Sequence, residues 1–442
     1  MRRLCAAELC LAAAILAVIC AGRAFAQPRP NIVLILADDL GWGDVAFNGR
    51  KEWGTPNLDR LAREGMMFPR WYSAATVCAP SRAAILTGKY GIHNGVTRNS
   101  DDLPLSEVTL AEALKARGYS TALFGKWHRG NPRSGETESV HPMDQGFDEF
   151  TGFLEAREAW QHFPETLWFG REQRPVDRMY ADTRFTDLAL DFFARKKNYP
   201  FFLFLSFTSA HLLIEAPLED VAEYVGKFPE RTSAEPWNAI YAAMVTRMDR
   251  EIGRVLRGLD ERGLAENTIV VFMSDNGATF EALNQGASDF HDSNRPFRGH
   301  KRNLWEGGIR VPGVVRWPGN VPAGRVSMEM VHAIDLFPTL LAAVGDSDPS
   351  LGVDGKVLLS VWKGKAPGPL RTVFWEWRSE GYSQLAALRD TWKLVITNGG
   401  PPELFDLVAD PGERRPIQAQ EPGLVADMKA TLDEWLHTET PR

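Results

Sequence analysis

The feature that most constrains the fold is a nearly continuous apolar, β-branched run at residues 31–37, Asn-Ile-Val-Leu-Ile-Leu-Ala. A strand with one wet face alternates polar and apolar side chains, whereas this run has no polar face. It therefore predicts a strand buried on both sides, as in parallel sheets that helices cover on both faces. Similar runs recur at residues 200–207 and 267–273.

Helical patterns alternate with these strands. The sequence predicts helices at residues 57–65, 80–87, 110–117, 183–195 and 237–262, and one further strand at residues 120–124. Such strand–helix alternation is typical of an α/β domain with a large, mostly parallel sheet flanked by helices on both faces.

The alternation ends near residue 343. Residues 346–350, Asp-Ser-Asp-Pro-Ser, are turn-forming and predict a boundary between an α/β domain at residues 27–343 and a smaller subdomain at residues 344–442. Beyond the boundary, short strand patterns occur at 372–377, 385–388, 392–396 and 404–406, followed by a helical pattern at 423–435. These patterns predict a small antiparallel sheet covered by one helix, an α+β subdomain.

Residues 1–26 have the pattern of a secretory signal peptide. Two arginines come first, an apolar run follows at residues 11–19, and Ala24-Phe25-Ala26 is a small-x-small cleavage site. The apolar run is too short to span a membrane comfortably, so we expect export without a stable membrane anchor. The mature chain has no Asn-x-Ser/Thr sequon, which fits a bacterial periplasmic or secreted protein.

The charge balance argues against nucleic acid or an anionic membrane as a partner. The chain has 50 Lys and Arg against 57 Asp and Glu, a net charge of −7, which becomes −9 without the three arginines and one glutamate of the leader. Any anion site must therefore be a local cluster of positive charge.

Two of the predicted buried strands end in oxygen-bearing side chains. Asp38 and Asp39 follow one strand, and Asp275 and Asn276 follow another. Ligand sites of open α/β sheets lie at the carboxyl ends of the strands, where these carboxylates would repel one another without a cation. Oxygen ligands favour Ca²⁺ or Mg²⁺. Taken singly, the first pair is also compatible with a helix cap and the second with an ordinary turn.

Cys78 is the only cysteine left once the leader is removed. It opens the segment 78–88, Cys-Ala-Pro-Ser-Arg-Ala-Ala-Ile-Leu-Thr-Gly, in which Pro80 suits the first turn of a helix. Cys78 would then lie at a helix N-terminus, which favours anions, with Arg82 four residues on and on the same face. This arrangement suits a nucleophile that attacks an anionic ester, although a lone cysteine can also be a small buried hydrophobe.

Four further side chains are candidates for an anion site. Lys126 and His128 are two residues apart, so an extended segment directs both to one side. His211 comes just after the strand pattern at 200–207, and Lys301 lies in a segment rich in positive charge. Solvated or structural roles are the alternatives for each residue taken alone.

Together these segments resemble the sulfatase family of the alkaline-phosphatase-like fold. The matching blocks run in family order at residues 37–44, 55–59, 78–88, 125–128, 274–277 and 305–312. The Cys-x-Pro-Ser-Arg-x-x-x-Leu-Thr-Gly pattern is the most specific of them.

The resemblance implies a chemistry for Cys78. In the family the motif cysteine is oxidised by a maturation enzyme, formylglycine-generating or anaerobic, to formylglycine (3-oxoalanine), whose aldehyde hydrates to a gem-diol. One hydroxyl attacks sulfur and the alcohol leaves, which gives a sulfated hemiacetal. The second hydroxyl is then deprotonated and expels sulfate. The family's metal, Ca²⁺ or alternatively Mg²⁺, would be bound by the modified Cys78 with Asp38, Asp39, Asp275 and Asn276.

The resemblance also implies roles for the basic residues. Lys126 and Lys301 would bind sulfate oxygens, Arg82 would stabilise the metal end, His128 would be the base, and His211 would contact the ester and protonate the leaving oxygen.

Two departures from the family pattern affect how side chains are placed. Ala210 and Leu213 stand where prolines commonly flank the histidine at 211, and His300 replaces a usual glycine and could line the substrate pocket.

The resemblance predicts hydrolysis of a sulfate ester, either a sulfated carbohydrate or an aryl sulfate. Aromatic rings between residues 131 and 182 could stack on such a substrate or could merely pack an insertion: Phe153, Trp160, His162, Phe163, Trp168 and Phe169. The alternatives are a phosphonate or phosphodiester hydrolase of the same superfamily and an inactive protein that binds sulfated glycans.

Overall fold

The computed structural model describes residues 29–129, 140–231, 235–346 and 348–438. The predicted leader at residues 1–26 lies outside this part of the chain. Within the described ranges, no helix is both long and apolar enough to cross a membrane.

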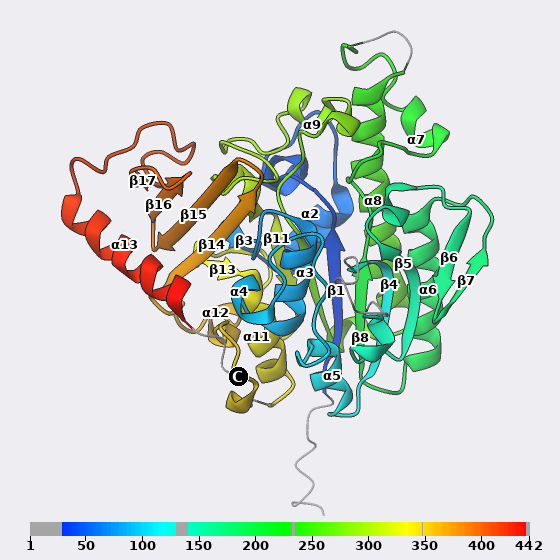
Figure 1. Cartoon of the computed structure of the whole chain (residues 1–442). Helices are drawn as coiled ribbons and strands as arrows, with labels where there is room; N and C mark the ends of the chain where they lie inside the picture. The colour runs from blue at the N-terminus through cyan, green and yellow to red at the C-terminus, as the bar shows by residue number, and fades with distance from the viewer. Residues whose placement is uncertain (1–28, 130–139, 232–234, 347, 439–442) are drawn as a thin grey trace, which may run out of the picture.

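The described residues build a central sheet of ten strands, in the order β12-β2-β11-β9-β1-β8-β4-β5-β6-β7. Five adjacent strands are parallel to one another: β9 (Thr268–Ser274), β1 (Asn31–Ala37), β8 (Phe201–Ser206), β4 (Ser120–Arg129) and β5 (Glu149–Glu155). Val33 of β1 is paired with Val270 on one side and with Leu203 on the other. The predicted mostly parallel sheet is therefore confirmed, and β1 lies at its centre (Figure 1).

Shorter strands complete the sheet edges and form a second, small sheet. At one edge lie β12 (Arg325–Val326), β2 (Met66–Met67) and β11 (Gly313–Arg316), and at the other the antiparallel β6 (Thr166–Phe169) and β7 (Glu172–Pro175). The small sheet consists of β10 (Arg310–Val311), β3 (Trp71–Tyr72) and β13 (Val331–His332).

Alternate residues of β1 face two apolar cores, one on each face of the sheet. Ile32, Leu34 and Leu36 belong to the core that includes residues of α3 (Cys78–Thr87), α5 (Leu110–Lys115) and α11 (Leu336–Ala343). The residues between them belong to the core formed with α2 (Pro56–Glu64), α6 (Ala181–Lys196) and α8 (Trp237–Glu261). This two-sided burial explains why the strand has no polar face.

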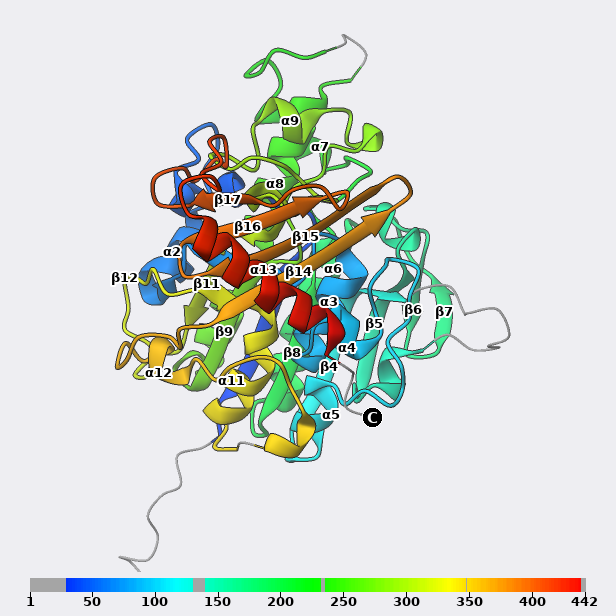
Figure 2. The same ribbon diagram turned by 60° about the vertical axis from the view of Figure 1, so that its left-hand side comes forward.

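The C-terminal region is a four-stranded antiparallel sheet with one long helix across it (Figure 2). Its elements are β14 (Thr372–Ser379), β15 (Tyr382–Arg389), β16 (Trp392–Thr397), β17 (Glu403–Asp406) and α13 (Pro422–His437). The predicted antiparallel sheet and helix are confirmed. Met428 and Leu432 of α13 share an apolar core with β1, and the boundary at residue 343 stays a prediction.

Short helices and turns connect these elements. The short α-helices are α4 (Gly91–Asn94), α7 (Leu218–Ala222), α9 (Ala287–Phe290), α10 (Glu306–Ile309) and α12 (Leu359–Trp362). Short 3-10 turns span Trp42–Asp44, Ala46–Asn48, Pro142–Asp144, Glu158–Trp160, Ala265–Asn267, Ala282–Asn284, Ala333–Asp335 and Pro349–Leu351.

Strand β4 differs from the prediction, because it continues past Phe124 to Arg129. The reason is β5, which the sequence analysis did not identify and which pairs with β4 beyond that point. At Gly125, β4 approaches β8 so closely that an added Cβ would lie 1.8 Å from the Ser206 carbonyl oxygen. The backbone there has φ +118°, a conformation that glycine tolerates best.

Candidate active site

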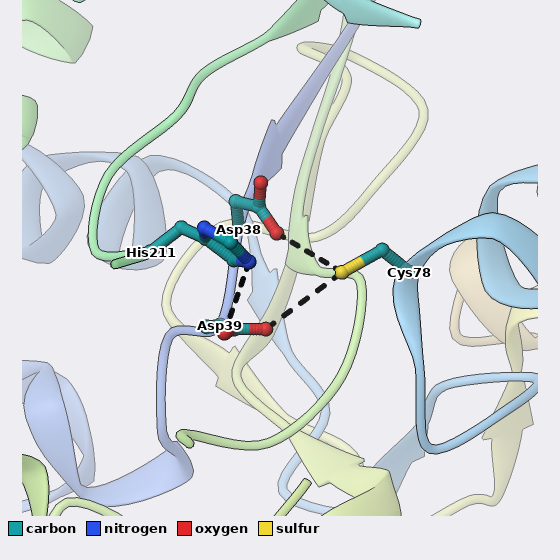
Figure 3. Close-up of side chains that lie close together, drawn as sticks. All are labelled: Asp38, Asp39, Cys78 and His211. Carbon is teal, nitrogen blue, oxygen red and sulfur yellow. Dashed lines mark hydrogen bonds and ion pairs between the residues drawn. The ribbon is translucent and has the colours of Figure 1, made fainter. Parts of the chain in front are cut away.

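Cys78 is the first residue of α3 and is fully buried. Its Sγ lies 3.4 Å from Asp38 Oδ1 and 3.9 Å from Asp39 Oδ1 (Figure 3). The residue before this helix, Val77, has no side chain that can cap it. Instead, the Ala79 N–H donates a hydrogen bond to the Asn99 side chain at 3.1 Å. The predicted position of Cys78 at a helix N-terminus is confirmed.

The acidic residues that follow β1 and β9 meet at one edge of the sheet. These strands are adjacent and parallel, with Ala37 paired to Ser274. The Asp39 N–H donates to Asp275 Oδ1 at 3.2 Å, and Asp39 adopts a left-handed backbone with φ 58°, which aspartate tolerates better than most residues. Asp38, Asp39 and Asp275 all have 0% exposure, so the predicted carboxylate cluster is confirmed.

The oxygen atoms of this cluster fit a hard cation. The ligand atoms of Asp38, Asp39, Cys78 and His211 all lie within 4.8 Å of one another. Asn276 donates from Nδ2 to Asp39 Oδ1 at 2.6 Å, while its buried Oδ1 has no hydrogen-bond partner among the described residues. Unpartnered buried oxygens are costly unless a ligand or ion satisfies them, so the donor set suits Ca²⁺ or Mg²⁺.

Three buried cations face the three carboxylates. Lys126 Nζ lies 2.5 Å from Asp38 Oδ2, and Lys301 Nζ lies 2.9 Å from Asp39 Oδ2. Arg82 Nη2 lies 2.9 Å from Asp275 Oδ2. The charges of these six side chains balance, so a divalent cation would leave the site positive, as an anionic ester requires.

The surroundings shift the carboxylate pKa values in opposite directions. Burial, with the Asp38 charge as a second cause, raises the pKa of Asp275 to about 7. Burial acts in the same direction on Asp38, but the charges of Lys126, Arg82 and Lys301 outweigh it and hold the pKa of Asp38 well below its usual range. The site therefore contains one strongly ionised carboxylate and one that protonates more readily.

Burial raises the pKa of the Cys78 thiol well above its ordinary value, and the charges of Asp275 and Asp38 add to the effect. The thiol is therefore protonated at neutral pH. Since the thiolate is the reactive form of cysteine, the unmodified side chain is not an activated nucleophile.

The two predicted histidines both face this cluster. His211 Nδ1 lies 2.6 Å from the Leu212 carbonyl oxygen, so Nδ1–H donates there and Nε2 is left as an acceptor. Nε2 lies 3.2 Å from Lys301 Nζ and 3.6 Å from Asp39 Oδ2.

Neither ring nitrogen of His128 has a hydrogen-bond partner within the described ranges. A bulge in β4 between Lys126 and Arg129, with φ 73° at His128, sets the direction of this side chain. Burial, then Lys126 and Arg82, lower the pKa of His128 well below its usual value, so the ring is neutral. Lys126 and His128 both reach the site, as predicted. The extended segment assumed in the prediction is interrupted by the bulge, which turns the His128 side chain toward the site.

A cavity of about 550 Å³ opens over Cys78. Its described lining residues are Cys78, Asn99, Ser100, His128, Glu155, Ala156, Arg157, Trp160, His211, Leu212, Glu281, Ala282, Leu283, Lys301 and Arg302. The cavity lies at the carboxyl ends of the parallel strands, where the fold leads one to expect a ligand site.

Only one of the proposed stacking aromatics reaches this cavity among the described residues, namely Trp160. Phe153 is buried in the core, and Phe169 and Trp168 pack against the core. His300 does not line the cavity, because its ring packs on Phe280 at a centroid distance of 4.7 Å and its Nδ1 contacts the Lys301 carbonyl oxygen.

Comparison with known proteins decides the family. Residues 30–346 match the family described as Sulfatase. The chain belongs to the sulfatase family. It is therefore a sulfuric ester hydrolase. Residues 298–439 also match the family described as N-sulphoglucosamine sulphohydrolase, C-terminal.

Similar proteins agree with this assignment. The sulfatase is 34% identical to steryl-sulfatase of Mus musculus, over 88% of this chain and 79% of the relative. It is 37% identical to N-acetylgalactosamine-6-sulfatase of Mus musculus, over 80% of this chain and 69% of the relative. The crystal structure of Ps i-CgsB in complex with k-i-k-neocarrahexaose superposes with a TM-score of 0.82 at 31% identity, covering 93% of this chain and 94% of that one.

The fold is shared more widely. The phosphonate monoester hydrolase of Agrobacterium radiobacter has a TM-score of 0.64 at 23% identity, covering 92% of this chain and 96% of that one. At this level of identity the likeness concerns the fold alone.

A hydrogen-bond network that the sequence analysis missed supports His211 of the sulfatase. The buried Asp182 carboxylate accepts from the backbone N–H and the hydroxyl of Thr208 at 2.9 and 3.1 Å, and from those of Ser209 at 3.3 and 2.6 Å. His162 contacts the His211 carbonyl oxygen at 3.1 Å and Thr208 Oγ1 at 3.1 Å. These contacts fix the turn in which the family's prolines are missing. In the sequence, the one sign of a role for Asp182 is its position in the first turn of α6, where acidic residues are favoured.

A buried ion cluster supports the loop of Lys301. Lys393 Nζ of β16 lies 2.9 Å from Glu306 Oε1 and 2.8 Å from Glu413 Oε1, and all three side chains have 0% exposure. The Glu306 N–H donates to Glu413 Oε2 at 2.6 Å, and the Tyr72 hydroxyl donates to Glu306 Oε2 at 2.9 Å. The C-terminal sheet thereby holds the segment that carries Lys301. Glu306 lies in the matching block at residues 305–312, but no pattern in the sequence predicted that it would pair with Lys393 and Glu413.

Proposed function

We propose that this sulfatase hydrolyses a sulfate ester of a carbohydrate or an aryl alcohol with a formylglycine made from Cys78 and a bound Ca²⁺, for which Mg²⁺ is the alternative. One observation carries the proposal. Cys78, in the most specific motif of the family, lies at a helix N-terminus beside two buried carboxylates and opens on a cavity lined by Lys301, His128 and His211.

Asp38, Asp39, Asp275 and Asn276 would hold the metal ion together with the modified Cys78 side chain. When bound, the ion supplies Lewis acidity and positive charge next to residue 78. Support comes from the buried carboxylates and from the Asn276 Oδ1 atom, which has no partner among the described residues.

The modification of Cys78 would change an inert group into a reactive one. The thiol is protonated and buried, whereas the hydrated aldehyde offers two hydroxyl groups at the same position. Because the side chain has no exposure in the folded chain, the maturation enzyme must act before α3 has packed against the sheet. This order fits oxidation of the chain before or during export.

The basic residues would bind the ester and move its protons. Lys126 and Lys301 would donate hydrogen bonds to sulfate oxygens, and Arg82 would balance the carboxylates. In its imidazolium form, which the bound anionic ester would favour, His211 would protonate the leaving oxygen through Nε2–H, since its Nδ1–H is committed to the Leu212 carbonyl. His128 would accept a proton in the release of sulfate, because its ring is neutral and its nitrogens are unpaired within the described residues.

The substrate class is drawn from the relatives. Their names refer to a steryl sulfate and to the 6-sulfate of N-acetylgalactosamine, and one solved structure holds a neocarrahexaose. We expect the enzyme to act outside the cytoplasm, in a bacterial periplasm or in the medium, because residues 1–26 have the pattern of an export signal.

Two esters of one alcohol test the reaction. The matured protein should hydrolyse 4-nitrophenyl sulfate with a larger kcat/KM than 4-nitrophenyl phosphate, and C78A should lose both activities. A larger kcat/KM for the phosphate would favour the phosphonate or phosphodiester hydrolase. Binding of a sulfated sugar without hydrolysis by protein with an oxidised Cys78 would favour the inactive binder.

A further inference from the structure

An apolar groove of about 640 Å³ lies beside the catalytic cavity, between the segment at residues 213–216, α7 and the start of α8. It gathers large apolar side chains that are exposed to solvent: Leu218 is 84% exposed, Val225 59% and Leu283 44%. Trp237 and Ile240 of α8 also line it. Single exposed apolar residues are ordinary, but several in one concave place indicate a ligand or partner.

The groove adjoins the catalytic cavity. Leu283 lines both spaces. Leu212 lines the cavity, and the next residue, Leu213, lines the groove. A molecule whose sulfate lies near Lys301 and which extends past Leu283 would reach the groove.

The two spaces differ in chemistry. The cavity is lined by ionisable groups such as Lys301, Arg157 and Glu281. The groove is lined mainly by aliphatic and aromatic side chains, with Glu215 and Glu235 as its charged members. A ligand that fits both has an anionic end and a large apolar end.

We infer that the groove binds an apolar extension of the alcohol, so that the preferred substrates are amphiphilic sulfate esters rather than small or wholly polar ones. This inference rests on the proposed function. The border that the two spaces share at Leu283 favours a part of the substrate as the occupant. A second copy of the chain or another protein seated there would lie against Leu283, which also lines the catalytic cavity.

A homologous series of esters tests the inference. In 4-alkylphenyl sulfates the reacting end and the acidity of the leaving phenol stay nearly constant while the alkyl chain grows from methyl to hexyl. Each buried methylene should raise kcat/KM about fourfold until the groove is filled. Because the groove is open to solvent at Leu218, we count about three to four of the five added methylenes as buried, which predicts a hexyl-to-methyl ratio of kcat/KM of about 100-fold in the matured enzyme.

Two matched variants locate the effect. Leu218 and Leu370 are 84% and 83% exposed, so neither L218E nor L370E should disturb folding. L218E should lower the hexyl-to-methyl ratio about tenfold because it places a charge in the groove. L370E, which lies outside the groove, should keep the wild-type ratio.

The outcomes separate the groove from the reaction. A hexyl-to-methyl ratio near one, with clear hydrolysis of the methyl ester, would overturn the inference that the groove binds substrate and would leave the proposed function intact. If no ester were hydrolysed, the proposed function would fail, and calorimetric titration with 4-hexylbenzenesulfonate and 4-methylbenzenesulfonate would still test the groove, because these sulfonates bind without reacting. Equal affinities would overturn it, as would a dimer in sedimentation that L218E dissociates.

Discussion

His211 and Lys301 reach the same carboxylate, Asp39, but two different regions of the molecule hold them. The Lys301 Nζ and His211 Nε2 atoms lie 3.2 Å apart. The turn of His211 is anchored by Asp182 on α6, inside the α/β domain. The segment of Lys301 is anchored by Lys393 on β16, in the C-terminal sheet.

The anchors also differ in their physics. Asp182 accepts hydrogen bonds from uncharged N–H and O–H groups, so its contribution is local and moderate. Lys393 lies between two fully buried carboxylates, Glu306 and Glu413. Removing one partner of such a cluster leaves uncompensated buried charge. The C-terminal sheet is therefore part of the architecture of the active site and not an appendage.

The largest expected effect comes from K393M. The variant keeps a long side chain but removes the charge between the two glutamates, so we expect a loss of about 3–5 kcal/mol in the free energy of unfolding. Activity should fall as well, because the Lys301 segment loses its anchor. Urea unfolding and kcat/KM measure the two effects. K429M, which removes an ion pair with 47% and 45% exposure, is the control and should cost less than about 1 kcal/mol. Equal losses in the two variants would contradict the account.

A smaller effect is expected from D182N. An amide in this place can accept through only one atom, so the N–H and O–H donors of Thr208 and Ser209 are partly unsatisfied, at a cost of about 1–3 kcal/mol. The kcat should fall more than the KM rises, because His211 is misplaced as a proton donor. D187N alters an exposed residue of the same helix and should leave both values nearly unchanged. If D182N lowered the free energy of unfolding as much as K393M, the proposed difference between the two anchors would be wrong.

The Lys301 anchor should also respond to pH. Burial, despite the opposing charge of Lys393, raises the pKa of Glu413 from 4.5 to about 7. Folding therefore favours the protonated form, and its contribution to stability is complete below about pH 4.5 and is lost as the pH rises to about 7. In this window E413Q should gain stability relative to the wild type as the pH rises, by about 1–3 kcal/mol in total. A difference that stays constant with pH in urea titrations would show that Glu413 is not the responding group.

The smallest expected effect is the coupling between the two anchors. Asp182 and Lys393 share no partner in the contacts described above, so the stability losses of D182N and K393M should add within about 0.5 kcal/mol in the double variant. Unfolding of the four proteins of this cycle measures the coupling. A coupling of 1 kcal/mol or more would mean that the two loops are held as one unit.

The sequence predicted the elements that have a strong local pattern. The run at β1 has no polar residue between Ile32 and Ala37, and the structure places it at the centre of the sheet. The sequence also predicted that the carboxylates after β1 and β9 lie close together, because the carboxyl ends of parallel strands meet at one edge of a sheet. Pro80 suits the first turn of a helix, and it correctly predicted the helix that the Cys78 motif forms.

The anchors could not be predicted in the same way. Lys393 and Glu306 are separated by 87 positions, and Glu413 and Glu306 by 107. Nothing near any of the three in the sequence marks it as a buried charge. His162 and Asp182 likewise act on a turn between 26 and 49 residues further along the chain. Contacts of this kind depend on the packing of distant segments, which a single sequence does not display.

The central claim is that Cys78 is the precursor of the nucleophile, and the mass of its tryptic peptide tests it most directly. The peptide extends from Trp71 to Arg82 and should be isolated from protein produced in the native host. The account predicts a mass roughly 18 Da below that of the cysteine peptide, the difference between a thiol and an aldehyde side chain. An intact thiol in exported, active protein would contradict it.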